Sequence, residues 1–291
     1  MLKKLLFHGI NTALVTPFKN NQIDYSALDK LIQEQISSNI GNIVVHGTTG
    51  ENPTLSWEEK LQVIEFIIEK TQNKINIIVG VGNNNTVETV EQIKNLSKYN
   101  IDAFLVTTPY YNKPTQEGLY QHFKLIAENT NKPIMLYNIV GRTGVNIDVA
   151  TLIRLSKIQN IQAVKESSGN IAQIMELLSL NLPEFSVVAG DDALFYPTLH
   201  LGAIGVVSVM SNVLPEKMAT LYQYFINKQY EEALALHNTL LPLINALFIE
   251  TNPLPVKTVL HLQGKIAEEF RLPLTTMQAQ HKNKLKDIFK I

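Results

Sequence analysis

The sequence predicts a (β/α)8 barrel that carries a helical appendage at its C-terminal end. Eight short apolar runs alternate with longer segments that have the apolar spacing of amphipathic helices. Successive runs begin about 19 to 33 residues apart, which is the spacing of strand–helix units. Nearly all runs are continuous, as in parallel strands that helices cover. Eight such units in roughly 225 residues fit a closed barrel better than an open doubly wound sheet.

The strands are expected where apolar and β-branched residues cluster between turn residues. In chain order they cover Ile10–Val15, Ile43–His46, Ile75–Val79, Ala103–Thr107, Ile134–Tyr137, Ile161–Lys165, Phe185–Ala189 and Ile204–Val209. Gly80 and Gly82 follow the third strand, but Asn85 stands where a dinucleotide-binding turn has its third glycine. These glycines therefore indicate a tight turn between strand and helix.

Helices are expected where apolar residues recur every three or four positions. The clearest between the strands are Tyr25–Ile36, Trp57–Glu69, Thr115–Glu128 and Leu214–Phe225. Ser56 and Glu59 form a capping-box pattern before the second of these. After the eighth strand, the pattern indicates three more helices at Tyr230–Phe248, Val256–Gln263 and Thr275–Phe289. We expect a barrel with the functional site over residues 1–228 and a three-helix extension over 229–291 that packs on it.

Composition excludes several classes of protein. The 291 residues carry 25 Lys and Arg against 26 Asp and Glu, a balance that argues against a nucleic-acid-binding or anionic-membrane surface. The absence of cysteine excludes disulfides and thiolate nucleophiles. No apolar run approaches the ~18 residues that cross a bilayer, and the first residues lack a signal-peptide core, so a cytoplasmic protein is expected. The seven histidines include no pair at metal-ligand spacing, so we expect no metal.

Two adjacent strands end in side chains that suit covalent catalysis. In such barrels the chemistry lies where strands end and the following loops begin. Lys165 finishes an apolar strand, where an ammonium is costly unless it is paired or deprotonated. A neutral lysine attacks ketones to form a Schiff base, and Tyr137, which ends the preceding strand, is placed as a general acid and base. The structural alternatives are a lysine paired with Glu166 and a tyrosine that is simply part of the core.

Three loops carry groups that suit recognition. The second strand runs into Gly47-Thr48-Thr49-Gly50-Glu51, whose hydroxyls and backbone N–H groups suit a carboxylate or phosphate. Arg142 lies between two glycines after Tyr137, and a guanidinium binds a carboxylate through two parallel hydrogen bonds, although a solvated arginine is the alternative. Tyr110 and Tyr111 follow the fourth strand and predict either a lid or a contact between subunits.

Taken together, these segments resemble the dihydrodipicolinate synthase family of pyruvate-dependent class I aldolases, which includes N-acetylneuraminate lyase. The matching motifs are Gly47-Thr48-Thr49-Gly50-Glu51, Thr107-Thr108-Pro109-Tyr110-Tyr111-Asn112-Lys113-Pro114-Thr115, Tyr137-Asn138 and Lys165-Glu166. The similarity runs in register from about Gly9 to the C-terminal helices. It implies a homotetramer built as a dimer of dimers, with no cofactor beyond the imine that pyruvate forms with the enzyme.

The resemblance also implies roles for individual residues. Lys165 matches the lysine that forms the Schiff base with pyruvate, and Tyr137 matches the tyrosine that transfers protons. Thr48 and Tyr111 match its partners in a hydroxyl relay, in which Tyr111 reaches in from a neighbouring subunit. The remaining matches concern substrate binding. They are Thr49 with Thr48 for the pyruvate carboxylate, Arg142 for the carboxylate of an aldehyde, and Gly190 and Val207 for the backbone that lines the pocket.

The choice of reaction rests on two of these motifs. Thr48-Thr49 and Arg142-Thr143-Gly144 are similar to the synthases, whereas sialate lyases usually have Ser-Thr in the first turn. The implied reaction condenses pyruvate with L-aspartate-4-semialdehyde to 4-hydroxy-tetrahydrodipicolinate, for diaminopimelate and lysine biosynthesis. Val140 departs from the family, which usually has proline there, and we expect a looser loop around Arg142.

A lysine effector pocket of the family maps onto six positions in this chain. These are Asn52, Trp57, Lys60, Asn84, Glu88 and Tyr110. Lys60 replaces the histidine of lysine-sensitive members, and its ammonium would repel the ammonium groups of lysine, so weak or absent inhibition is expected. Two alternatives to the synthase stay open. One is another pyruvate-dependent aldolase, such as N-acetylneuraminate lyase or 2-keto-3-deoxygluconate aldolase, and the other is a non-catalytic ligand-binding protein on the same scaffold.

Overall fold

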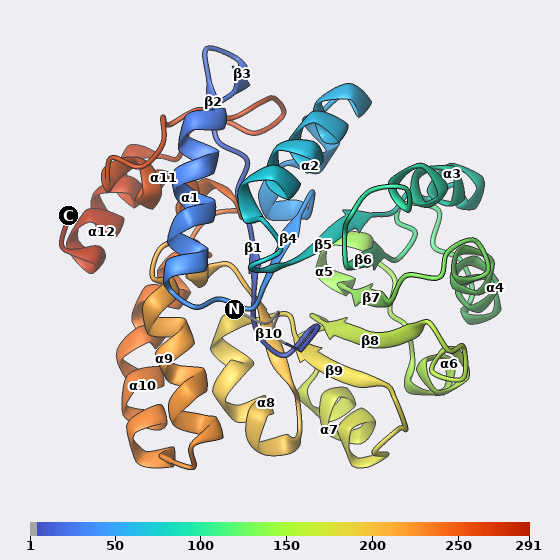
Figure 1. The fold of residues 1–291 in the computed structure, drawn as a ribbon. Coiled ribbons are helices and arrows are strands. Elements are labelled where there is room, and N and C mark those ends of the chain that lie inside the picture. Colours follow the sequence, from blue (N-terminus) through green and yellow to red (C-terminus); the bar gives the residue numbers. More distant parts are fainter. Residues whose placement is uncertain (1–4) are drawn as a thin grey trace.

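The predicted (β/α)8 barrel is confirmed by the computed structural model, which describes residues 5–291. Eight parallel strands close in the order β1-β10-β9-β8-β7-β6-β5-β4, and β1 pairs with both β10 and β4 (Figure 1). They are β1 (Gly9–Ala13), β4 (Asn42–Val45), β5 (Asn76–Val81), β6 (Ala103–Thr107), β7 (Ile134–Asn138), β8 (Ile161–Glu166), β9 (Ser186–Ala189) and β10 (Gly205–Ser208). The eight expected strands are therefore the eight of the barrel.

Helices surround the barrel and continue past its last strand (Figure 1). They are α1 (Tyr25–Ser37), α2 (Trp57–Thr71), α3 (Thr86–Leu96), α4 (Gln116–Ala127), α5 (Val140–Thr143), α6 (Val149–Leu155), α7 (Ile171–Ser179), α8 (Phe195–Leu201), α9 (Pro215–Ile226), α10 (Tyr230–Ala246), α11 (Leu254–Leu262) and α12 (Ala279–Phe289). The short α5 lies at the barrel mouth (Figure 1). A short hairpin of β2 (Phe18–Lys19) and β3 (Gln22–Ile23) precedes α1. None of the helices within residues 5–291 is both long and apolar enough to span a membrane.

The largest differences from the expected elements lie at their ends. The first strand stops at Ala13 rather than Val15, because the Val15 N–H donates to the Asn212 side chain (3.1 Å) instead of to a neighbouring strand. The last helix begins at Ala279 rather than Thr275. The capping box before α2 is present as expected, since the Ser56 hydroxyl accepts from the Glu59 N–H and the Glu59 carboxylate accepts from the Ser56 N–H.

The barrel interior is apolar along its middle and polar at both ends. Side chains that fill it include Val44, Ile78, Met135, Ala163 and Val188. Because side chains alternate along a strand, Tyr137 and Lys165, which lie two positions after Met135 and Ala163, also point inward. At the opposite end of the barrel, three buried asparagines lie side by side on neighbouring strands, namely Asn11, Asn42 and Asn76. The Asn76 Nδ2 donates to the Asn42 Oδ1 (2.9 Å).

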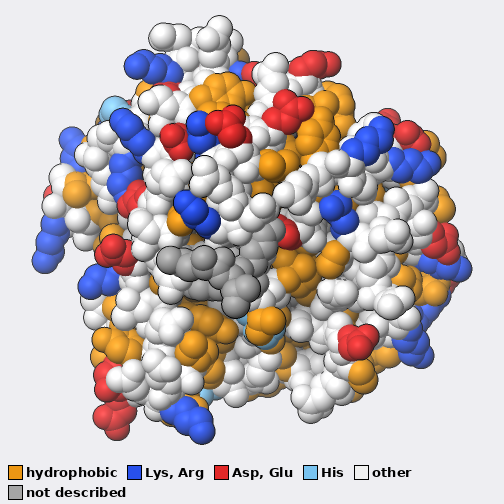
Figure 2. All heavy atoms as spheres, viewed as in Figure 1, with side chains coloured by type: hydrophobic (Ala, Val, Ile, Leu, Met, Phe, Trp, Pro, Cys, Tyr) orange, Lys and Arg blue, Asp and Glu red, His pale blue; other side chains and the backbone are white. Residues whose placement is uncertain are grey.

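The C-terminal helices pack on the barrel. Helix α10 packs against α9 and α8, α11 contacts the turn Met210–Asn212 after β10, and α12 packs on α10 and α11. The division of the chain at residue 228 stays a prediction. Charges of both signs are scattered over the face drawn in Figure 2, without a continuous basic surface outside the residues in grey. That distribution agrees with the near-balance of charges in the sequence.

Two buried histidines make the fold sensitive to acid. Burial lowers the pKa of His46 and of His122 to about 4, against 6.5 in an unfolded chain. Each histidine therefore contributes stability that is present above pH 6.5 and is lost as the pH falls through 4, roughly 2 kcal/mol by pH 5. Burial also raises the pKa of Asp192 to about 6, which opposes part of this loss over the same range.

We expect His122→Gln to reduce this acid sensitivity. The decrease in unfolding free energy from pH 7 to pH 5, measured with urea, should be about 2 kcal/mol smaller in the variant than in the wild type. Comparing the two proteins cancels the contribution of Asp192. An equal decrease in both would show that His122 is not held neutral in the fold.

Candidate active site

Lys165 and Tyr137 meet inside the mouth of the barrel. The register of β7 and β8 pairs the two residues directly, and the Lys165 Nζ lies 3.8 Å from the centre of the Tyr137 ring. Both side chains are buried, with 7% and 5% of their surface exposed. A cationic ammonium over a ring face is stabilised, and the contact places the two side chains predicted to act in catalysis next to each other.

The pairing of Lys165 with Glu166 that the sequence left open is wrong. Glu166 faces the outer side of the strand, where it accepts hydrogen bonds from Asn138 Nδ2 (2.9 Å) and the Ser168 N–H (2.7 Å). Successive strand residues point to opposite faces, so Lys165 and Glu166 diverge. No carboxylate among residues 5–291 forms a salt bridge with Lys165, so its amine is left to react.

A pocket of about 70 Å³ lies directly above these two residues. Its wall includes the turn at Gly47, Thr48 and Thr49, the backbone at Gly190 and Val207, and the Arg142 side chain. Every residue predicted to touch substrate from within its own chain therefore lines one cavity. Gly190 is required there, because a Cβ would lie 1.7 Å from the Ser167 Oγ and 3.0 Å from the Glu166 carbonyl oxygen.

The turn after β4 presents hydroxyl groups to the pocket. Thr48–Gly50 forms a single 3-10 turn, and Glu51 closes it in the left-handed conformation (φ 53°). The Thr16 hydroxyl donates to the Gly50 carbonyl (2.7 Å), which fixes the turn against the end of β1. Thr49 is almost fully buried, with 3% of its surface exposed. Its hydroxyl is therefore held in place before any substrate enters.

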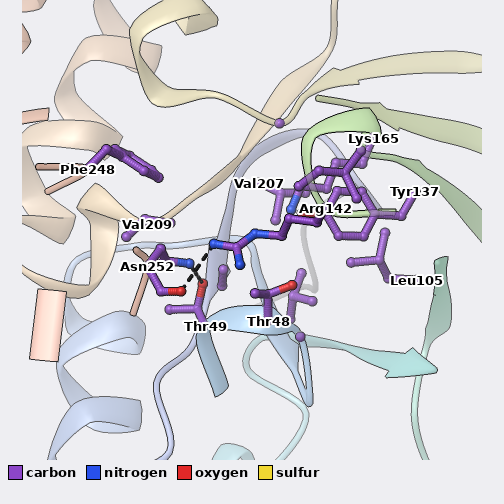
Figure 3. Close-up of a pocket in the computed structure, with 15 residues that line it drawn as sticks. Thr48, Thr49, Leu105, Tyr137, Arg142, Lys165, Val207, Val209, Phe248 and Asn252 are labelled. Carbon is purple, nitrogen blue, oxygen red and sulfur yellow. Dashed lines mark hydrogen bonds between the residues drawn. The ribbon is translucent and has the colours of Figure 1, made fainter. Parts of the chain in front are cut away.

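Arg142 reaches across the pocket from the opposite side. It lies in α5, where the Gly144 N–H closes the turn on the Val140 carbonyl (2.9 Å). The Arg142 Nη2 donates to the main-chain oxygen of Asn252 (3.1 Å), as Figure 3 shows. Arg142 is exposed, so the solvated arginine that the sequence left as an alternative stays open, but its side chain lines the pocket. The looser loop expected from Val140 stays a prediction.

Sequence reasoning missed further residues that line the same pocket, among them Leu105, Val209, Phe248 and Asn252. Leu105 lies within β6 and Val209 follows β10, whereas Phe248 and Asn252 come from the segment between α10 and α11. Asn252 donates from its Nδ2 to the Thr49 hydroxyl (2.9 Å). No local pattern could have found it, because the two residues are 203 positions apart and Asn252-Pro253 reads as a break between helices. The C-terminal extension therefore contributes to the site.

Tyr111 lies outside the pocket of its own chain. Its side chain is 87% exposed, and its backbone adopts a positive φ of 74°, which is unusual for an aromatic residue. Tyr110 beside it is also exposed. The monomer therefore does not bring Tyr111 to Lys165 and Tyr137.

The predicted effector residues are only partly brought together. A larger cavity of about 430 Å³ adjoins the pocket and shares Thr48, Tyr137 and Arg142 with it. Three of the six effector positions, Asn52, Lys60 and Tyr110, line this cavity. The other three, Trp57, Asn84 and Glu88, do not. Glu88 instead accepts hydrogen bonds from Asn83 (2.6 Å) and Asn85 (2.9 Å) at the start of α3.

A buried lysine and tyrosine at the mouth of a (β/α)8 barrel, facing hydroxyl groups and an arginine, define an enzyme of the class I aldolase type. Residues 5–291 hold no group of three His, Asp or Glu side chains placed to bind a metal. Residues 6–291 match the model of the dihydrodipicolinate synthetase family. The chain belongs to this family.

Individual relatives agree over almost the whole length. The chain is 48% identical to the 4-hydroxy-tetrahydrodipicolinate synthase of Syntrophus aciditrophicus (strain SB), with 97% of each chain covered. It superposes on the dihydrodipicolinate synthase of Thermotoga maritima with a TM-score of 0.96, at 40% identity and with 98% of each chain covered. A dihydrodipicolinate synthase variant described as the first monomeric one also gives a TM-score of 0.96, at 40% identity, covering 98% of this chain and 96% of that one.

Proposed function

We propose that the chain is a 4-hydroxy-tetrahydrodipicolinate synthase, which condenses pyruvate with L-aspartate-4-semialdehyde for diaminopimelate and lysine biosynthesis. The observation that carries this proposal is the Lys165 amine, which is buried against Tyr137 with no carboxylate partner among residues 5–291 and lines one pocket with the Thr48-Thr49 turn. Family membership and the names of the relatives support the choice of reaction.

The geometry supports a sequence of covalent steps on Lys165. Its Nζ attacks the ketone carbon of pyruvate, and loss of water leaves an imine. Tyr137, whose ring centre lies 3.8 Å from the Lys165 Nζ, is the residue proposed to move the protons of this step. Loss of a methyl proton then gives an enamine, whose carbon bonds to the aldehyde carbon of the second substrate. The amino group of that substrate displaces Lys165, closes the ring and frees the enzyme.

The pocket walls orient the two substrates. Thr48 and Thr49 hold the pyruvate carboxylate, and Gly190 and Val207 line the cavity through their backbone. Arg142 binds the carboxylate of the aldehyde, since its guanidinium is held at one nitrogen only. No cofactor is required, because the protonated imine itself accepts the electrons that the methyl C–H bond releases.

The proposed reaction is tested by following the semialdehyde with each substrate omitted in turn. Consumption that requires both pyruvate and enzyme supports the synthase. Cleavage of sialate or 2-keto-3-deoxygluconate, with the semialdehyde untouched, supports one of the other aldolases. Pyruvate binding without turnover of any of these compounds supports the non-catalytic alternative.

We also propose that the enzyme works as a homotetramer built from two dimers. The exposed and strained Tyr111 fits a residue that completes the hydroxyl relay of a neighbouring subunit with Tyr137 and Thr48. Partly exposed apolar side chains also lie on the adjacent helices α7 and α8, among them Ile171, Met175 and Leu201. A dimer of dimers needs a second contact surface besides the one at Tyr111, and we propose these helices for it. Sedimentation of the purified chain tests this assembly.

Inhibition by lysine is expected to be weak. Lys60 lines the larger cavity, and burial lowers the pKa of its ammonium, as expected where no carboxylate compensates. A second ammonium about 4 Å away would be repelled by roughly 4 kcal/mol in such a site. Steady-state rates with and without millimolar lysine should differ little, and Lys60→His should increase the inhibition. A wild-type rate cut to a small fraction would refute the expectation.

A further inference from the structure

We infer that Asn252 is a positioning residue, which sets the direction of the Thr49 hydroxyl and the place of Arg142 and thereby couples the two carboxylate sites. This inference rests on the proposed function, which gives Thr49 and Arg142 to the two substrates. Asn252 itself is buried, with 7% of its surface exposed, at the wall of the pocket between Thr49 and Arg142 (Figure 3).

The polarity of one hydrogen bond carries the argument. The Asn252 Nδ2 donates to the Thr49 Oγ1 at 2.9 Å, and an amide nitrogen only donates. The Thr49 oxygen therefore acts as the acceptor in this contact, and its own hydrogen is left for another partner. No described residue accepts that hydrogen. It is free to point into the pocket, where the proposed pyruvate carboxylate is an acceptor without hydrogens of its own.

The same residue fixes the arginine through its main chain. The Asn252 carbonyl oxygen accepts from the Arg142 Nη2 at 3.1 Å, which restrains a long side chain and leaves its other nitrogens for a ligand. Asn252 thus touches one group proposed for each substrate. A side-chain substitution removes only the contact with Thr49, because the carbonyl belongs to the backbone. The two contacts therefore have separable effects.

A second contact holds this segment against the same turn. The buried Lys257 ammonium, one turn further along α11, pairs with the Glu51 carboxylate that follows Thr49 by two residues. Both side chains of this pair have no exposed surface. The C-terminal segment is therefore anchored beside the turn independently of Asn252, so Asn252 variants keep the segment in place and report on the hydrogen bond.

The test compares Asn252→Ala and Asn252→Asp with the wild type. Loss of the donor in Asn252→Ala should raise the KM for pyruvate about 10-fold, with a smaller change in the KM for the semialdehyde. Asn252→Asp should raise it about 100-fold, because a carboxylate would accept the Thr49 hydrogen and repel the substrate carboxylate. A KM for pyruvate that barely changes in Asn252→Asp would overturn the inference, because neither the lost donor nor the added charge would then act on the substrate carboxylate.

A double-variant cycle separates positioning from general damage. In a Thr49→Val background, which has no hydroxyl to orient, Asn252→Ala should cause no further rise in the KM for pyruvate. An equal rise in both backgrounds would overturn the inference. Reduction of the pyruvate imine by borohydride needs no aldehyde, so it measures pyruvate binding separately from the condensation. Wild-type enzyme that traps no pyruvate would overturn the proposed function itself, whereas normal trapping with an unchanged KM in Asn252→Asp would overturn only the role of Asn252.

Discussion

Lys165→Arg is expected to abolish condensation and to prevent any covalent attachment of pyruvate. Arginine keeps a positive charge beside the Tyr137 ring, but its guanidinium stays protonated and forms no Schiff base. The rate should fall by at least about a thousandfold, because the covalent route is lost and only substrate binding remains. The measurement is the initial rate of semialdehyde consumption with saturating pyruvate.

A matched substitution at a surface lysine serves as the control for Lys165→Arg. Lys98 is exposed after α3 and lines neither of the two cavities, so Lys98→Arg should leave the rate unchanged. Folding of Lys165→Arg is checked by its urea unfolding curve. A folded Lys165→Arg enzyme with substantial activity would show that the amine of Lys165 is not the nucleophile.

Lys257→Met is expected to destabilise the fold by about 3–5 kcal/mol. The Lys257 ammonium lies between the rings of Phe18 (4.4 Å) and Phe270 (4.9 Å) and pairs with Glu51. Removing the ammonium leaves the buried Glu51 carboxylate with one hydrogen bond, from the main-chain N–H of Arg271 (3.2 Å), among residues 5–291. The free energy of unfolding in urea should therefore fall by a large fraction of the total.

The effect of Lys257→Met has a specific control in the double variant with Glu51→Gln. Because the neutral amide carries no uncompensated charge, most of the lost stability should return. Lys124→Met is a comparison at the surface, since Lys124 and Glu128 form an exposed pair at 3.9 Å, and its cost should stay below about 0.5 kcal/mol. Equal losses at the buried and exposed lysines would contradict the account.

The barrel and the core of the site were predictable because their signals are local. Buried parallel strands are apolar runs of a few residues, and Lys165 and Tyr137 each interrupt such a run at its end. The turn at Thr48 and Thr49 and the glycine-flanked Arg142 also have local signatures. Once the strand order is known, the barrel brings all of these residues to one rim.

The contribution of the C-terminal segment was not predictable in the same way. Asn252 and Lys257 look like a helix boundary and a helix-surface lysine in the sequence, yet both are buried against the turn after β4. Their partners lie more than 200 positions earlier, so only the folded chain reveals them. The effector pocket was likewise placed only in part, because Glu88 bonds to neighbouring asparagines rather than facing the cavity.

The most direct test of the account is to treat the enzyme with pyruvate and borohydride and to locate the product by mass spectrometry of its peptides. We expect one reduced pyruvate on Lys165 and none on Lys165→Arg. Pyruvate binding without any covalent product, or a covalent product on another lysine, would contradict the central role of Lys165.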